Sequence, residues 1–140
     1  MVPEQLGGKV ADHPNLQLFE RAFAAFGAAD METLSHAFDE NVVWHAPGDS
    51  QLSGEHQGQE ATFAMFGNEF QLSNGSIRPE LQQAVATDET VVALLRTTAK
   101  REGRKPLDQD VVLTFRVRGG KLAEGWTIWT DQPAADAFWS

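Results

Sequence analysis

The sequence of 140 residues contains no cysteine and no tyrosine, and its 20 Asp and Glu side chains outnumber 11 Lys and Arg side chains. Without cysteine, the chain can form no disulfide, thiolate metal site or thiol nucleophile. Without tyrosine, it has no phenolic hydroxyl to serve as an acid or a hydrogen-bond donor. The formal net charge of −9 opposes binding to phosphate backbones, so we expect no nucleic-acid partner.

Long hydrophobic runs are also missing. No apolar stretch approaches the roughly 20 residues that a membrane-spanning helix needs, and no basic flank precedes an apolar segment at the N-terminus. We therefore expect no membrane partner and predict a cytoplasmic protein. No group of histidines and carboxylates has the close spacing of a zinc or iron site, so we expect no metal and no cofactor.

What the chain does contain is typical of a packed globule. Its hydrophobic residues make up 41% of the total and include nine Phe and four Trp. The length suits one domain. Residues 1–13 show no periodicity and read as a flexible leader, and residues 14–140 are predicted to form a single domain.

Helical spacing dominates the first half of the sequence. Apolar side chains recur every three or four residues from Pro14 to about Gly27, which predicts a first helix. Asp30 is placed to cap a second, short helix that carries Phe38. A third helix is predicted from Gly58 onward, until a Ser-Asn-Gly-Ser turn at residues 73–76 stops it.

The second half of the sequence has the period of two that is typical of strands. A short strand is also expected in the first half, over residues 42–46. The turn Pro47-Gly48 ends this strand and places His45 near its C-terminal end. The later strands are predicted over residues 77–86, 91–101, 111–118 and 122–131, followed by a short helix over residues 134–139. Tight turns between strands favour antiparallel pairing, so the pattern predicts an α+β fold with helices on one sheet face.

Several segments then show a resemblance to a known family. They are Trp44-His45-Ala46-Pro47-Gly48, Leu52-Ser53-Gly54, Gly58-Gln59-Glu60-Ala61, the stretch 126–132 and Phe138-Trp139. In their order and spacing, over roughly residues 14–139, they resemble the SnoaL-like branch of the nuclear transport factor 2-like superfamily. The resemblance implies a cone: a curved antiparallel sheet wrapped around three N-terminal helices, with a short C-terminal helix.

The activities of the resembled superfamily differ in the residues that they need. Its ketosteroid isomerases use a carboxylate base where this chain has Ala46, together with a tyrosine that this chain lacks, which argues against that mechanism. Its epoxide hydrolases use an Arg-x-Asp pair, for which the nearest match is Arg96-Thr97-Thr98, so one acid is missing. Its polyketide cyclases use a carboxylate near the end of the last strand, and Asp131 is the counterpart here.

Asp131 and His45 are the two catalytic candidates. Asp131 could exchange protons with a substrate, with its pKa raised by burial or lowered by a cation such as Arg96. Alternatively, Asp131 caps the helix that begins near Pro133. His45 could be a general base or a hydrogen-bond donor, or it could be a neutral ring bonded to the backbone of a hairpin at residues 54–58.

A cone closed by helices leaves a cavity where side chains do not fill it. Most aromatic residues at helical spacing fill the core, and the predicted ligand pocket is lined by Phe23, Trp44, Phe63, Phe66, Arg96 and Trp129. On the last strand, Trp126 points opposite to Trp129, and we expect it to face a partner subunit. The resemblance implies a homodimer formed through the outer sheet face.

These residues predict a SnoaL-like domain that binds a small apolar or aromatic ligand. If it is an enzyme, the expected class is a cofactor-independent isomerase or cyclase that acts by acid–base chemistry on a hydrophobic carbonyl compound. The alternative is a non-catalytic ligand-binding or dimerisation module of the same fold. An epoxide hydrolase is a weaker third candidate.

Overall fold

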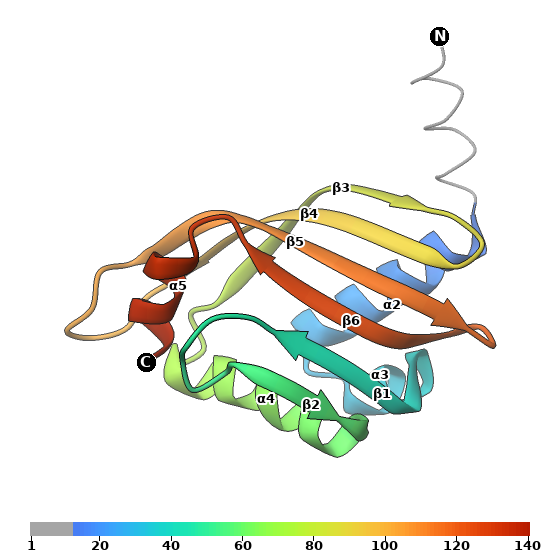
Figure 1. Cartoon of the computed structure of the whole chain (residues 1–140), viewed down its shortest axis with the longest axis horizontal. Helices are drawn as coiled ribbons and strands as arrows, with labels where there is room; N and C mark the ends of the chain where they lie inside the picture. Colours follow the sequence, from blue (N-terminus) through green and yellow to red (C-terminus); the bar gives the residue numbers. More distant parts are fainter. Residues whose placement is uncertain (1–12) are drawn as a thin grey trace, which may run out of the picture.

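The computed structural model describes residues 13–140 (Figure 1). Its elements are α2 (Pro14–Ala28), α3 (Met31–Ala37), β1 (Phe38–Ala46), β2 (Gly54–Gln57), α4 (Gly58–Leu72), β3 (Arg78–Ala86), β4 (Thr90–Ala99), β5 (Leu107–Arg118), β6 (Lys121–Trp129) and α5 (Gln132–Trp139). Apart from His13, the predicted leader over residues 1–13 lies outside the described part of the chain. Within that part, no helix is both long enough and apolar enough to span a bilayer.

The first two helices begin where the sequence indicated, and the first also ends close to its predicted end. The ring of His13 accepts a hydrogen bond from the backbone N–H of Asn15 at the start of α2. Helix α2 ends where Ala29 adopts the left-handed conformation, with φ of 55°. The carboxylate of Asp30 then accepts a hydrogen bond from the N–H of Thr33 and so caps α3.

Strand β1 is longer than the sequence indicated, and Phe38 belongs to this strand rather than to the preceding helix. Phe38 pairs with Leu122 of β6, and the register between these two strands shifts before Val43. In the polar stretch between them, the carboxylate of Asp39 accepts a hydrogen bond from the N–H of Asn41. The irregular, polar stretch has no alternating pattern, so the sequence alone did not reveal this part of the strand.

The six strands form one sheet in the order β2-β1-β6-β5-β4-β3. All neighbouring pairs are antiparallel except β1 and β6, which run parallel. The predicted α+β fold is therefore confirmed, with a mixed sheet in place of a purely antiparallel one. The chain can join β1 to β6 in parallel because four further strands and α4 come between them in the sequence.

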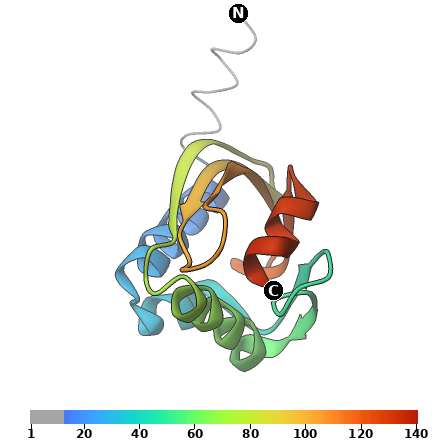
Figure 2. The ribbon, with the colours of Figure 1, turned by 90° about the vertical axis from the view of Figure 1, so that its left-hand side faces the viewer.

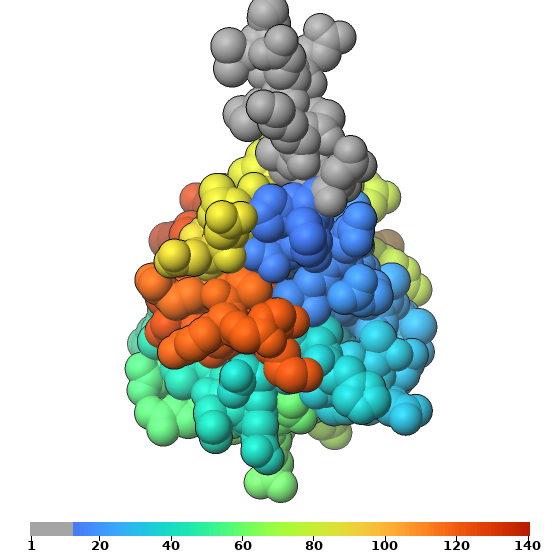
Figure 3. Space-filling view, turned by 90° about the vertical axis from the view of Figure 1, so that its right-hand side faces the viewer, coloured from blue at the N-terminus to red at the C-terminus, as the bar shows by residue number. Residues whose placement is uncertain are grey.

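The sheet curves around the helices, with α2, α3 and α4 on its concave face (Figures 1 and 2). At one end of the molecule, the β3–β4 and β5–β6 turns lie beside the starts of α2 and β1 (Figure 3). The side-chain amide of Asn15 donates hydrogen bonds to the backbone carbonyls of Thr87 and Asp88 there. Lys121 likewise donates to the carbonyl of His36. These polar contacts join the helices to the sheet and close this end.

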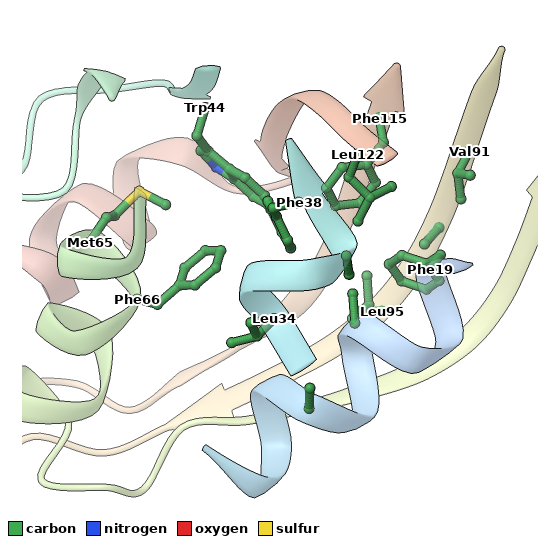
Figure 4. Packing of buried hydrophobic residues seen from close by; sticks show 14 of the residues in the cluster. Phe19, Leu34, Phe38, Trp44, Met65, Phe66, Val91, Leu95, Phe115 and Leu122 are labelled. Carbon is green, nitrogen blue, oxygen red and sulfur yellow. The ribbon is translucent and has the colours of Figure 1, made fainter. Parts of the chain in front are cut away.

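Aromatic side chains fill much of the space between the sheet and the helices. Trp44 and Phe38 of β1 and Phe66 of α4 point toward one another (Figure 4), and the rings of Trp44 and Phe66 meet edge to face at 5.3 Å. The indole of Trp44 lies directly on Gly125 of β6, where a Cβ atom would come within 2.8 Å of it. The absence of a side chain at Gly125 therefore lets Trp44 lie flat inside the cone.

Candidate functional site

A cavity of about 90 Å³ lies inside the cone. Since roughly 10–15 Å³ of such volume is enough for one water molecule, the cavity has room for several ligand atoms. Its wall is built by α2, α3, α4 and every strand except β2, and it is mostly apolar. The aromatic part of the wall includes Phe19, Phe23, Phe26, Trp44, Phe66 and Trp129.

Four of the predicted pocket residues line this cavity: Phe23, Trp44, Phe66 and Trp129. The fifth predicted aromatic residue, Phe63, does not. Its ring packs edge to face against Phe38 at 5.7 Å and stacks on Phe66 at 6.0 Å. Phe63 therefore packs against Phe38 and Phe66 and does not line the cavity.

Two threonine side chains add polarity to the wall, Thr97 of β4 and Thr127 of β6. The indole Nε1–H of Trp44 donates a hydrogen bond to Oγ1 of Thr127 at 2.8 Å. A hydroxyl group can accept this bond and still donate its own proton. Thr127 is thus a donor that can be directed to a ligand, and the bond from Trp44 strengthens it by polarisation.

Glu69 of α4 is the only ionisable residue in the described wall of the cavity. Among residues 13–140, its carboxyl group has neither a hydrogen bond nor an ion pair with another side chain. Part of the residue remains accessible, but desolvation dominates at the carboxyl. Burial raises the pKa of the Glu69 carboxyl from 4.5 to about 8. At neutral pH the cavity therefore contains an uncharged carboxylic acid.

The sequence analysis did not identify Glu69, although the sequence carries a signal for it. The buried side chains of α4 are Thr62, Met65 and Phe66. Glu69 follows them at the spacing of three, four and seven residues that defines one helical face. A carboxylate at such a position is aimed at the apolar side of the helix, and this is the pattern that could have revealed it.

His45 lies on the opposite face of the sheet, away from the cavity. Because neighbouring residues of a strand point to opposite faces, the inward position of Trp44 turns His45 outward. Its Nε2 atom lies 2.6 Å from a carboxylate oxygen of Glu124, and its Nδ1 atom lies 3.6 Å from Glu55. The imidazole also stacks on the indole of Trp126 at 5.1 Å. His45 contacts side chains on the outer face, and its ring does not bond the hairpin backbone.

Asp131 and Arg96 also lie outside the cavity wall. The carboxylate of Asp131 accepts a hydrogen bond from the N–H of Ala134 at 3.2 Å and so caps α5. Arg96 is on the outer face of β4, where it donates hydrogen bonds to Asp108 and Asp110 at 2.8 and 3.2 Å. These two carboxylates raise the pKa of the Arg96 guanidinium. Neither catalytic candidate, Asp131 or His45, lines the cavity.

Apolar side chains are exposed on the outer face of the sheet. Ile128 of β6 is 48% exposed, and Val92 of β4 is 37% exposed. Between the strands, a groove is lined by Trp126 and Ile128 together with His45 and Arg116. In the described part of the chain, no group of three or more histidines and carboxylates could hold a metal ion.

Comparisons with known proteins agree with this architecture. A family model described as a SnoaL-like domain matches residues 19–125. An uncharacterized protein of Mycobacterium tuberculosis is 30% identical over 132 residues, which cover 94% of this chain and all of that protein. The structure of Bal32a, from a soil-derived mobile gene cassette, is 37% identical with a TM-score of 0.86 and covers 91% of this chain and 97% of its own.

A more distant structure shares the fold. IdmH of Streptomyces antibioticus, proposed to be a polyketide cyclase, is 20% identical with a TM-score of 0.70. The likeness covers 89% of this chain and 95% of that one. At this level of identity the comparison concerns the cone-shaped fold and not the residues inside it.

Proposed function

Because this chain belongs to the SnoaL-like domain family and has an apolar cavity inside its cone, we propose that it binds a small, uncharged, hydrophobic carbonyl compound there. The single observation that carries this proposal is the aromatic wall with one directed hydroxyl donor. Apolar pockets with a few placed polar groups are typical of small-molecule sites. Each 100 Å² of apolar ligand surface that enters such a site contributes roughly 2.5 kcal/mol.

The polar groups of the wall support a carbonyl compound over a pure hydrocarbon. The Trp44 N–H uses one acceptor position of Thr127 Oγ1, which leaves the hydroxyl proton free for a ligand oxygen. Among the described residues, the wall has no Lys, Arg or His. An anionic ligand would therefore lose its hydration without gaining a cationic partner, and this cost favours uncharged ligands.

Binding alone and catalysis are both compatible with this cavity. The position of Asp131 as a helix cap and of His45 on the outer face favours a binding module, because neither group lines the cavity. The second candidate function is a cofactor-independent isomerase or cyclase that works by acid–base chemistry. It is favoured by Glu69, an ionisable group on the cavity wall.

The binding site can be tested by filling the cavity from α2. Ala22 is buried and lines the cavity, whereas Ala24 is an exposed residue of the same helix. We expect acetophenone to raise the melting temperature of the wild type and of the control variant Ala24→Leu. Ala22→Leu should bind this probe at least about 10-fold more weakly, because its added methyl groups occupy the ligand volume. Isothermal titration calorimetry would measure the affinities, and equal binding by both variants would place the ligand elsewhere.

We also propose that the protein forms a homodimer through the outer sheet face. Trp126, Ile128 and Val92 give this face an apolar centre. Around it lie charges of both signs, with Arg116 near Glu124 at 3.9 Å. An apolar centre with a polar rim is typical of interfaces between protein subunits.

A further inference from the structure

The position of Glu69 is costly for a residue with only a structural role. Its carboxyl group has no cation and no hydrogen-bond donor among the described residues, and it belongs to a mostly apolar cavity wall. A desolvated ionisable group without a partner lowers stability, and a neutral or apolar side chain at this site would avoid the cost. Groups with such perturbed ionisation, located in a cavity, are typical of functional sites.

The residues around the cavity are the groups that can affect the ionisation of Glu69. The elements that face it across the cavity are α2, α3, β1, β3, β4, β5 and β6. Within the described residues, they contribute apolar side chains, Pro79, Thr97 and Thr127, and no second titratable group. The ionisation of this cavity therefore depends on one carboxyl group, and two threonine hydroxyl groups belong to the same wall.

We infer that Glu69 is the catalytic acid–base residue of this cavity and that the protein enolises the carbonyl compound that it binds. This inference rests on the proposed binding function. The site would act on ketones or aldehydes that carry a hydrogen on the carbon next to the carbonyl group and are otherwise apolar. Carboxylic acids would be poor substrates, because the described wall offers no cation to their negative charge and that charge would oppose the ionisation of Glu69.

The reaction is a balanced proton transfer. The Glu69 carboxylate takes a proton from the carbon next to the carbonyl, the electron pair of the broken C–H bond forms a C=C bond, and the carbonyl π pair moves to oxygen. Thr127 donates a hydrogen bond to this oxygen while negative charge develops on it. Glu69, now a carboxylic acid, returns the proton to the same carbon or to a conjugated one, giving exchange or isomerisation. The step consumes no oxidant, reductant or cofactor.

The desolvated position of Glu69 suits this role for a second reason. A general base works best when its pKa lies near the working pH, and burial places the pKa of Glu69 at about 8. An ordinary, exposed glutamate would be ionised at this pH but would be a much weaker base. The apolar wall that desolvates Glu69 thus also strengthens its carboxylate as a proton acceptor.

The inference is tested by hydrogen–deuterium exchange at the methyl group of acetophenone in D₂O, followed by proton NMR. The variants are Glu69→Gln and the control Glu60→Gln, which changes an exposed glutamate at the start of the same helix. We expect the wild type and Glu60→Gln to exchange the methyl protons faster than buffer does. Glu69→Gln should lose at least about 100-fold of this protein-dependent rate. Its affinity for acetophenone should stay within about threefold of the wild-type value.

Two further measurements separate the possible failures. Glutamine matches the shape of a neutral glutamic acid, so Glu69→Gln should fold, and near-ultraviolet circular dichroism will verify this. The wild-type exchange rate should rise with pH and level off above about pH 8. If folded Glu69→Gln binds acetophenone and exchanges its protons as fast as the wild type, the inference about Glu69 is overturned and the binding function stands. If the wild type does not bind acetophenone, the proposed function is overturned as well.

Discussion

Glu69 makes the stability of this protein depend on pH in an unusual direction. Its pKa is about 8 in the folded protein and near 4.5 in the unfolded chain. Between these two values the unfolded state releases the proton while the folded state retains it, so the free energy of unfolding falls as pH rises. This contribution is fully present below about pH 4.5 and lost above about pH 8. Its size is on the order of several kcal/mol, at about 1.4 kcal/mol for each pKa unit.

The substitution Glu69→Gln should remove this pH dependence. We expect the variant and the wild type to have similar stability near pH 5, where Glu69 is uncharged in the folded state. At pH 8.5 the variant should be more stable by on the order of a few kcal/mol, since glutamine cannot ionise. Urea unfolding at both pH values, monitored by tryptophan fluorescence, measures the difference. Glu60→Gln is the control, and a wild-type curve that stays parallel to that of Glu69→Gln would show that burial does not perturb this carboxyl.

Among the elements, α5 is held in place at both ends. At its start, Asp131 caps the helix, and the side chain of Gln109 bonds the backbone N–H and carbonyl of Asp131 at 3.0 Å each. At its end, Arg101 donates hydrogen bonds to the carbonyl of Phe138 and Arg104 donates to that of Ala137. Asp131 thus caps α5 through its side chain and bonds Gln109 of β5 through its backbone.

Removal of this cap should cost stability without changing the chemistry of the cavity. We expect Asp131→Ala to lower the free energy of unfolding by about 1 kcal/mol, because an N–H in the first turn of α5 loses its acceptor. Asp131→Asn should cost much less, since asparagine also caps helices well. Acetophenone binding and proton exchange should be unchanged in both variants. A loss of exchange in Asp131→Asn, at wild-type stability, would restore Asp131 as a catalytic candidate.

For the whole molecule, the proposed dimer gives the outer sheet face a role separate from that of the cavity. A stable interface buries about 1,200–2,000 Å² in total over both subunits. The His45 ring, stacked on Trp126 and paired with Glu124, lies on this same face. The Trp44-His45 dipeptide therefore contributes one aromatic ring to the cavity and one to the proposed interface.

The dimer is tested by sedimentation equilibrium of the wild type and two charge variants. Ile128→Lys places an ammonium group at the apolar centre of the outer face and should shift the protein to monomer at micromolar concentration. Met31→Lys is the matched control, because Met31 of α3 is also 48% exposed but lies away from the sheet. A monomeric wild type, or equal dissociation by both variants, would contradict this interface.

The sequence by itself determined most helices and strands of this protein and which residues of a strand share one face of the sheet. Helical spacing, the cap at Asp30 and strand alternation are local properties, and alternation alone separates Trp44 from His45 and Trp129 from Trp126. Together with the family resemblance, these local properties also determined the cone. The strand at Phe38 was missed because the polar residues that follow it interrupt the alternation.

Only the tertiary structure decided what each face meets. Asp131 could have been a pocket acid or a helix cap, and its bond to Ala134 shows the cap. In the sequence, Glu69 resembles the other glutamates of the helices. Its distinct environment forms only when α2 and the curved sheet pack around α4. Desolvation, and the raised pKa that follows from it, depend on residues up to 60 positions away in the chain, such as Thr127 and Trp129. Local spacing places Glu69 on the apolar face of α4 but contains no information about the cavity that forms there, so its raised pKa could be recognised only from the fold.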